Sequence, residues 1–266
     1  GGNIFNGIWN STNTGLELDV NVPQDSSVVN FNFTPGTSIS FNGTSDQVII
    51  DGNSAYQTST SLTIEAWVKP LSTPSDYDGF LSYSMDANGT RAGFGFCFYL
   101  TGWKFFLVTA DGSYLTGDPG EEVFNYAAMA GAQLPINQWT HIAATYNGSQ
   151  VKLYRNGSEV DANDNNVEGS IIWEGAPMEM VLGNFPREGQ GHYFDGKLDE
   201  IRIWNIVRTE NEIKASKEIA LLGDEDGLVG YWMLDEGSGN SSENLSIIGE
   251  TATLSGATWS ENDSPL

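Results

Sequence analysis

Two adjacent carboxylates, Asp199 and Glu200, stand at the start of an apolar run in the segment DGKLDEIRIWNIV (residues 195–207). The leucine and isoleucines around them predict a strand that packs on a core, where a buried carboxylate is costly unless a positive charge meets it. A divalent cation can supply that charge, because calcium takes hard oxygen ligands. A solvated strand entrance, or an ion pair with Arg202, accounts for the same pattern.

Aromatic side chains suggest a second kind of chemistry. The C–H groups of a sugar ring stack on a flat aromatic face, while its hydroxyls bond to amides, carboxylates and guanidinium groups. The chain has eight Trp and ten Tyr residues. Trp67, Trp139, Trp204 and Trp232 lie within predicted strands, and we expect them in the core. Candidates for a sugar site lie in predicted loops or at strand ends, namely Trp103, Tyr114, Phe124, Tyr126, Trp173, Phe185 and Tyr193.

Short strands separated by turns must position these residues. Residues 16–22 alternate strictly between apolar and polar side chains, and further runs of strand length follow at short intervals. Asn-Gly pairs lie between them, and Asn147-Gly148 suits a type I′ hairpin turn. The spacing predicts an all-β fold, a two-sheet antiparallel jelly-roll sandwich. We expect a single domain over residues 1–266, with strands in residues 1–30 completing the sandwich.

One helix and one long loop interrupt the strand pattern. Thr209 followed by Glu212 forms a capping box, and apolar residues beyond it predict one short helix near 209–222. The longest segment without a strand pattern runs from residue 111 to residue 133. Loops of this length are commonly functional, so we expect an ordered binding loop that includes Tyr126.

The composition excludes several partners. Eleven basic residues against 35 acidic ones give a formal net charge of −24. Nucleic acid and anionic membranes are unsuitable partners, because binding either requires clustered Lys and Arg. No stretch approaches the roughly 18 apolar residues of a membrane span. The single cysteine, Cys97, lies in an apolar run, so we expect a small core side chain and no intrachain disulfide.

Five segments resemble, in order, the laminin G-like, concanavalin A-like jelly roll common in secreted bacterial proteins. They are FNGTSDQVIIDG, SLTIEAWVKP, NQWTHIAATYNGSQVKLYRNGSEV, GKLDEIRIWNIVRTENEIKA and GLVGYWMLDEGSGN. The matching segments cover most of residues 39–259, and pentraxins are similar in the same places. The resemblance implies the concanavalin A-like jelly-roll fold. It also implies a binding module for glycans or proteins, of the kind attached to polysaccharide-degrading enzymes or adhesins.

The resemblance further implies a structural calcium ion. The strand LDEIRIW is similar to the terminal strand of family-sixteen glycoside hydrolases, a relative of this fold. In those enzymes the aspartate at the position of Asp199 ligates calcium, and backbone carbonyls of N-terminal strands complete the shell. Carried onto this chain, Asp199 is the side-chain ligand and carbonyls near Gly43 are its partners.

Pentraxins also suggest where a ligand would bind. Two of their loops carry calcium ions that mediate ligand binding, and these loops match SMDANGTRAG and GNFPREGQGHYFDG in this chain. The second loop departs from the pentraxin pattern, because it lacks the acidic cluster. Together with the 111–133 segment, the two loops would rim a concave face. The resulting predicted contact set is Asp86, Asn88, Tyr126, Glu188 and Tyr193.

The residues do not form a recognisable catalytic constellation. Family-sixteen hydrolases carry E-x-D-x-x-E on one strand, and here Glu17 and Asp19 lack the third carboxylate. A jelly-roll lyase would draw on side chains such as Tyr99, His192 and Arg91, but no lyase motif surrounds them. We therefore expect a chain without catalytic activity.

The leading hypothesis is a non-catalytic carbohydrate-binding or adhesion module, stabilised by calcium, of an extracellular bacterial protein that is secreted or held at the cell surface. Its partners would be a polysaccharide or glycan and the neighbouring domains of a larger protein. One alternative is a polysaccharide lyase or glycoside hydrolase on the same fold. Another is a structural module between domains that has no glycan ligand.

Overall fold

The computed structural model describes residues 9–12, 15–18, 36–87, 90–99, 102–109, 128–130, 133–163, 168–173, 178–187 and 190–266. The chain divides into two units, Gly1–Pro35 and Gly36–Leu266. In the first unit, β1 (Trp9–Thr12) and β2 (Gly15–Leu18) form a two-stranded sheet of their own instead of completing a sandwich sheet. That residues 1–266 make one domain remains a prediction.

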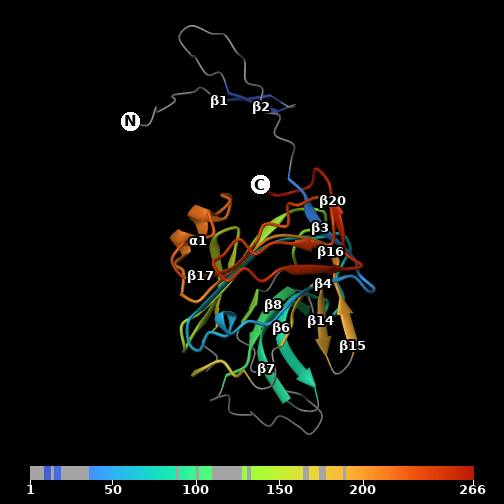
Figure 1. Cartoon of the computed structure of the whole chain (residues 1–266). Helices are drawn as coiled ribbons and strands as arrows, with labels where there is room; N and C mark the ends of the chain where they lie inside the picture. Colours follow the sequence, from blue (N-terminus) through green and yellow to red (C-terminus); the bar gives the residue numbers. More distant parts are fainter. Residues whose placement is uncertain are drawn as a thin grey trace. The chain divides into compact units, whose positions relative to one another are not determined.

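The second unit is the predicted sandwich of two antiparallel sheets (Figure 1). Over the described residues, one sheet has eight strands in the order β12-β11-β10-β5-β16-β3-β20, with β17 paired to β16. These strands are β3 (Ser38–Asn42), β5 (Leu62–Pro70), β10 (Thr140–Tyr146), β11 (Val151–Arg155), β12 (Ser158–Asn163), β16 (Asp195–Trp204), β17 (Leu228–Trp232) and β20 (Thr258–Ser260).

The other sheet has ten strands in the described part of the chain, in the order β18-β19-β4-β13-β6-β7-β8-β9, and a β14–β15 hairpin attached to β6. The strands are β4 (Gln47–Ile50), β6 (Gly79–Ala87), β7 (Thr90–Tyr99), β8 (Gly102–Leu107), β9 (Ala128–Ala130), β13 (Met180–Leu182), β14 (Asn184–Arg187), β15 (Gln190–Tyr193), β18 (Ser241–Ser242) and β19 (Ala252–Ser255).

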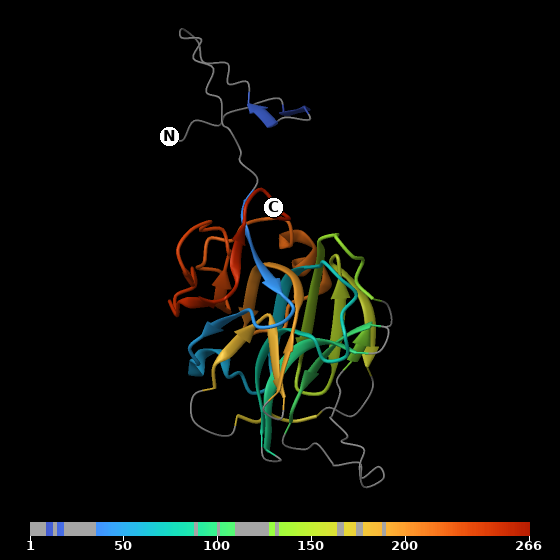
Figure 2. The same cartoon turned by 90° about the vertical axis from the view of Figure 1, so that its right-hand side faces the viewer.

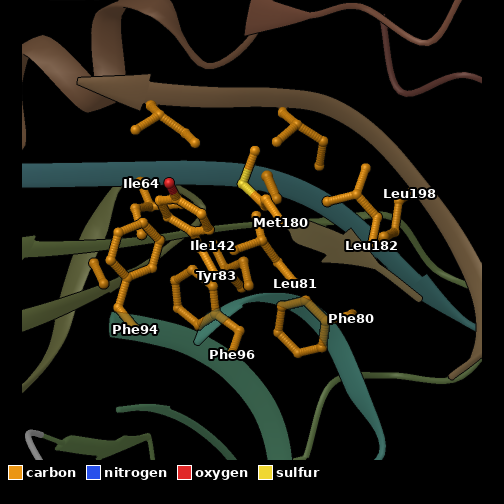
Figure 3. Packing of buried hydrophobic residues seen from close by; sticks show 14 of the residues in the cluster. Ile64, Phe80, Leu81, Tyr83, Phe94, Phe96, Ile142, Met180, Leu182 and Leu198 are labelled. Atoms are coloured by element: carbon orange, nitrogen blue, oxygen red, sulfur yellow. The ribbon is translucent and has the colours of Figure 1, made fainter. Parts of the chain in front are cut away.

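The hydrophobic core fills the space between the two sheets. Ile64, Ile142 and Leu198 point into it from the eight-stranded sheet and meet aromatic rings of the other sheet (Figure 3). Phe80 and Phe96, on neighbouring strands, stack with centroids 5.4 Å apart. Fully burying a side chain of this size contributes about 1.5–3 kcal/mol, so the alternating apolar residues of these strands account for the sandwich.

The eight-stranded sheet is also covered on its outer face. Every described residue of β5 from Leu62 to Val68 is buried, although side chains alternate between the two faces of a strand. The cover includes helix α1 (Glu210–Ser216), whose Ile213 packs on Ala143 and Tyr154. The predicted capping box of Thr209 and Glu212 is confirmed, but the helix ends at Ser216 and not near residue 222. A 3₁₀ turn, η1 (Ser54–Tyr56), precedes β5.

The hairpin predicted at Asn147-Gly148 is present between β10 and β11, but its turn is not of type I′. A type I′ turn needs positive φ at both central residues. Asn156 (φ 51°) and Gly157 (φ 79°) meet that condition between β11 and β12. At Asn147-Gly148 only Gly148 has positive φ. Here a four-residue loop joins β10 to β11, so Asn147 does not need the left-handed conformation of a two-residue turn.

Strand pairing and ion pairs hold the C-terminal segment against the eight-stranded sheet. β20 pairs with β3, and the Asp263 carboxylate that follows accepts hydrogen bonds from Lys69 and Lys197. Burial alone would raise the pKa of Asp263, but the two ammonium groups lower it to about 2. Among the described residues, no helix is long and apolar enough to cross a membrane.

Candidate functional site

A β-bulge in β16 explains the adjacent carboxylates. Asp199 lies opposite Trp67 of β5, whereas Arg202 lies opposite Glu65, so β16 has one residue more than its partner over this interval. Glu200 occupies the left-handed region with φ 52°. The extra residue interrupts the alternation of inward and outward side chains, and it carries two carboxylates into a buried part of the sheet.

Glu200 is neutralised by Arg202, whose guanidinium donates to one of its carboxylate oxygens. The Tyr231 hydroxyl lies 3.0 Å from the same oxygen. Arg202 also donates to the carbonyls of Ser216 and Ile219, at 2.9 and 2.7 Å. The arginine therefore links a buried carboxylate of the sheet to the end of α1 and the turn beyond it.

A matching link joins Glu65 to α1. Arg208 donates to the Glu65 carboxylate, to the Ser216 hydroxyl and to the Glu212 carbonyl. His141 lies with Nε2 at 3.3 Å from the other Glu65 oxygen, and burial lowers the pKa of His141. Burial would raise the pKa of Glu65, but His141 and Arg208 lower it. These groups are buried beside the helix and serve the fold.

Asp199 meets different surroundings. The Ser264 hydroxyl donates to its Oδ2 at 2.7 Å, and the Glu200 backbone N–H donates to Oδ1 at 3.0 Å. Burial, together with the nearby carboxylates of Asp235 and Glu200, raises the pKa of Asp199 well above its usual range. The predicted partner Gly43 does not lie beside it: Gly43 follows Asn42, which pairs with Asp195, four residues away along β16. The predicted pair of calcium ligands is thus not brought together.

Asp235 lies in the region of Asp199 and Ser264. A Cβ on Gly36 would lie 2.6 Å from Asp235 Oδ1 and 3.1 Å from Ser264 Oγ, so both oxygens lie close to this glycine. Asp235 also accepts from the Thr37 N–H, and burial raises its pKa. Over the described residues, no group of three or more Asp, Glu, His or Cys side chains is arranged to hold a metal ion.

The outer face of the ten-stranded sheet carries the β14–β15 hairpin. Phe185 packs on Phe106 of β8, with centroids 5.0 Å apart, and both join Cys97 in a small buried cluster. Gly79 permits this approach, because a Cβ there would lie 2.3 Å from that of Phe185. Cys97 is buried as predicted, on this outer cluster and not in the central core.

Next to this hairpin lies a group of side chains that we call the tyrosine–lysine cluster: Tyr77, Tyr99, Lys104 and His192. The Lys104 ammonium lies 3.9 Å from the ring centroid of Tyr99 and 4.9 Å from that of Tyr77. The Tyr77 ring contacts those of Tyr99 and His192 at 5.1 and 5.6 Å. Lys104 is only 2% exposed, whereas the three rings are half-buried.

The strand register places the cluster on one face. Cys97 pairs with Lys104 across β7 and β8, and Tyr99 follows Cys97 by two residues, so all three point outward from the core. His192 pairs with Phe185 and shares its side of the hairpin. The cluster therefore presents half-exposed aromatic rings next to the hairpin, in a form that suits sugar stacking.

A short turn holds Tyr77 in place. Its φ of 71° lies in the left-handed region, which a tyrosine adopts only when its surroundings impose it. The Tyr77 N–H donates to the Phe98 carbonyl at 2.7 Å, and the Phe98 N–H donates to the Asp78 carbonyl at 2.9 Å. Asp78 in turn accepts from the Ser75 N–H. The backbone on both sides of Tyr77 is thus fixed by hydrogen bonds.

The predicted contact residues have mixed positions. Asn88, Tyr126 and Glu188 lie outside the described residues, and Asp86 lies in β6 with its side chain outside that description. Tyr193 is half-buried in β15, on the side of the hairpin opposite His192. The described residues therefore do not test this contact set, and it stays a prediction.

Sequence reasoning missed Tyr77 and Lys104. Tyr77 lies in a segment without strand periodicity, and its left-handed conformation leaves no mark in the sequence. Lys104 interrupts the apolar run WKFFL, and a lone cation inside a buried strand was an available signal. Trp103 lies at the start of β8, as predicted, but its ring is fully buried in the core and does not face a ligand site.

Comparison with known proteins gives a family match over most of the second unit. The family described as the concanavalin A-like lectin/glucanases superfamily matches residues 42–214. Mouse pappalysin-1 is 34% identical over 83 residues, which are 30% of this chain and 5% of pappalysin-1. The chain thus corresponds to a small part of that relative.

Solved structures show the same fold at low sequence identity. A candidate carbohydrate-binding protein of Bacteroides ovatus matches 94% of this chain and 69% of its own, with a TM-score of 0.63 and 18% identity. A heptameric pentraxin of Limulus polyphemus covers 85% of this chain and 95% of its own, with a TM-score of 0.53 and 15% identity. The CBM40 of Ruminococcus gnavus IT-sialidase, bound to α2,3-sialyllactose, covers 68% and 98%, with a TM-score of 0.50 and 17% identity.

Proposed function

Because this chain belongs to the concanavalin A-like lectin/glucanases superfamily, we propose that it is a non-catalytic glycan-binding module whose ligand lies on the tyrosine–lysine cluster. The observation that carries the proposal is the pair of half-exposed rings, Tyr77 and Tyr99, fixed on the outer face of the ten-stranded sheet. Solved relatives of this fold include a candidate carbohydrate-binding protein and a sialyllactose complex, which supports the ligand class.

The arrangement suits binding better than catalysis. A retaining or inverting glycosidase needs two carboxyl groups on opposite sides of the scissile bond. The cluster instead combines aromatic faces with one buried ammonium, and its aromatic contacts hold the rings in position. Preorganised rings of this kind lower the entropic cost of binding a flexible sugar chain.

Glycan titration of ring-deletion variants tests the proposal. We expect Tyr77→Ala and Tyr99→Ala to weaken binding to a panel of alginate, ulvan, agar and β-glucan by about tenfold or more, because each removes a stacking face. Leu222→Ala is the control, since Leu222 is 85% exposed and lies between α1 and β17, away from the cluster. Isothermal titration calorimetry supplies the affinities, and assays for reducing ends and unsaturated products should stay blank.

Tyr193→Ala distinguishes the two sides of the hairpin. If this variant loses binding while Tyr77→Ala and Tyr99→Ala bind like wild type, the ligand lies on the predicted loop rim and the assignment to the cluster is wrong. If the wild-type protein depolymerises any of the polymers, the non-catalytic assignment fails.

We also propose that calcium binds between Asp199 and Asp235. Two carboxylates and the Ser264 hydroxyl are the hard oxygen donors that calcium takes, and further carbonyls or water would complete the shell. Burial raises the pKa of both carboxyls, so a bound cation would offset the cost of keeping them ionised. Gly43 has no part in this site.

The setting of the protein is a separate proposal. We propose an extracellular bacterial protein, secreted or held at the cell surface, in which this module adjoins other domains. The family match supports this setting, and the small share of pappalysin-1 that the chain matches is consistent with a module of a longer protein. Immunodetection on intact cells and in culture medium would test it.

A further inference from the structure

We infer that an apolar patch beside β17 binds a protein surface that has an apolar centre and a basic rim. This inference goes beyond glycan binding and does not depend on the tyrosine–lysine cluster. Four of the eight large apolar side chains that are exposed in the described part of the chain form this patch. The leucine–isoleucine patch, as we call it, consists of Ile219, Leu222, Leu245 and Ile247.

The segment between β18 and β19 has its apolar side chains outside and its polar ones inside. Buried and exposed side chains alternate strictly over residues 242–247. The exposed positions include Leu245 and Ile247, the latter with 83% of its surface exposed. The buried positions are all polar, namely Ser242, Asn244 and Ser246. An inverted pattern of this kind indicates that a second surface covers the apolar side chains.

Hydrogen bonds hold the segment in this orientation. The Asn244 amide accepts from the Tyr231 N–H at 2.9 Å and donates to the Tyr56 hydroxyl at 3.0 Å. The Ser246 hydroxyl donates to the Val229 carbonyl at 2.8 Å. Exchanging the two sides of the segment would break these bonds and leave buried polar groups without partners. The folded chain therefore keeps the apolar side of the segment outward.

A tight loop carries the other half of the patch against this segment. Glu225 accepts from the N–H groups of Leu222 and Gly223, at 2.8 and 2.9 Å. A Cβ on Gly223 would lie 2.1 Å from the Leu245 carbonyl oxygen, so the loop and the segment are in direct contact. Ile219 precedes the loop, and its carbonyl accepts from a buried arginine. A backbone fixed in this way lowers the entropic cost of binding a partner.

The charges around the patch select its occupant. Residues 218–226 and 243–247 contain five acidic residues and no basic one. Four of the acidic residues are exposed, namely Glu218, Asp224, Asp226 and Glu243. Glu218 is paired with Lys217 of the chain itself. Charge complementarity therefore favours a partner that places Lys or Arg side chains around its apolar centre.

Other occupants suit the patch less well. In a symmetric contact with a second copy, two acidic rims would meet, and each chain already carries a formal charge of −24. An anionic membrane is disfavoured for the same electrostatic reason. Sugar rings stack on flat aromatic faces, and the patch offers aliphatic side chains instead. A protein surface with basic and apolar side chains remains.

Matched peptides test the inference on the full chain. The probe is a synthetic amphipathic helix of about 18 residues, built from Leu and Lys. A Leu/Glu helix of the same pattern has the wrong charge, and a Ser/Lys peptide lacks the apolar face. We expect fluorescence anisotropy in about 0.15 M salt to show binding of the Leu/Lys helix about tenfold or more tighter than that of the other two.

Charge-neutral variants locate the binding. Leu222→Ser/Ile247→Ser should weaken binding of the Leu/Lys helix by about tenfold or more, because it removes two exposed apolar side chains and leaves the net charge unchanged. Val160→Ser/Leu266→Ser is the matched control, since both positions are apolar, exposed and outside the patch. The control should bind the helix like the wild type.

Three outcomes would overturn the inference. Equal binding of the Leu/Lys helix by the wild type and both double variants would assign the binding to the overall negative charge. A wild-type dimer in sedimentation equilibrium that Leu222→Ser/Ile247→Ser converts to a monomer would identify a second copy as the occupant. Binding to phosphatidylcholine vesicles that the same variant loses would identify a lipid surface. Glycan titration of this variant should match the wild type, so failure of the patch leaves the glycan site intact.

Discussion

Asp199 and Glu200 are neighbours in the chain, yet they meet opposite electrostatic environments. The bulge in β16 directs Glu200 toward Arg202 and Tyr231, while Asp199 is directed toward Ser264 and the region of Asp235. One carboxylate is therefore paired within the protein, whereas the other has a hydroxyl and a backbone N–H as its described donors. Burying charge without a cationic partner is costly, so Asp199 is the residue at which a bound cation would contribute most.

Replacing Asp199 by Asn separates a cation site from a protonated carboxyl. The pKa of Asp199 is raised in the folded state above its ordinary value of 3.8. Without a cation, the contribution of Asp199 to stability is therefore fully present below pH 3.8. It is lost as the pH rises through the pKa of Asp199 in the folded state. In EDTA, we expect the melting temperature of the wild type to decrease over this window, and Asp199→Asn to reduce the decrease.

Calcium should reverse this behaviour. A cation that binds only the native state at 100 times its Kd stabilises by about 2.7 kcal/mol, and Asp199→Asn should lose most of that gain. Asp224→Asn, at an exposed position, is the control and should respond like wild type. A wild-type melting temperature that is identical in calcium and in EDTA at pH 7 would show that no structural calcium is bound.

Hydrogen bonds from two arginines, Arg202 and Arg208, stabilise the short helix α1. A seven-residue helix is marginal in isolation. Here Arg208 joins the Glu212 carbonyl to buried Glu65, and Arg202 joins the Ser216 carbonyl to buried Glu200. The helix is thus linked at a carbonyl of its first turn and at the carbonyl of its last residue to charges that belong to the sheet.

Removing one arginine should expose the cost of the buried charge. We expect Arg208→Met to lower the free energy of unfolding by about 3–5 kcal/mol, because Glu65 is left buried with its arginine partner removed. The double variant Arg208→Met/Glu65→Met should recover part of the loss. Lys214→Met, on the exposed surface of the same helix, should change stability little. Urea unfolding measures all four proteins, and a loss below 1 kcal/mol in Arg208→Met would contradict this account.

The sandwich as a whole was predictable because its strands have clear local patterns. Alternation and turn residues indicated the strands of both sheets. The spacing of Leu198, Ile201 and Ile203 also indicates the bulge, since a regular strand would place inward apolar residues two apart and Leu198 and Ile201 are three apart. For strands that are buried on both faces, it was harder to predict which face each side chain takes. β8 is buried along its whole length, so its Trp103 gave no sign of which face it would take.

The candidate site was less accessible to sequence reasoning because its parts come from distant segments. Tyr77 precedes β6, Tyr99 and Lys104 end one strand and begin the next, and His192 comes from the hairpin. Their contacts depend on register and on a left-handed backbone at Tyr77, which are properties of the folded chain. Of the predicted contact residues, only Tyr193 has a described side chain, so the loop rim stays a prediction.

The pairing of β3 with β20 has a mechanical consequence. Ser38 lies opposite Ser260, and Gly36 lies against Ser264, so the first and last segments of the second unit meet at one corner (Figure 2). Tension applied between residues 36 and 266 therefore peels the two strands apart one rung at a time. Tension between residue 36 and a cysteine introduced at the exposed Ser255, which precedes β20, would shear all rungs together. Single-molecule pulling should give a lower rupture force for the first geometry, and equal forces would show that this strand pair does not resist the load.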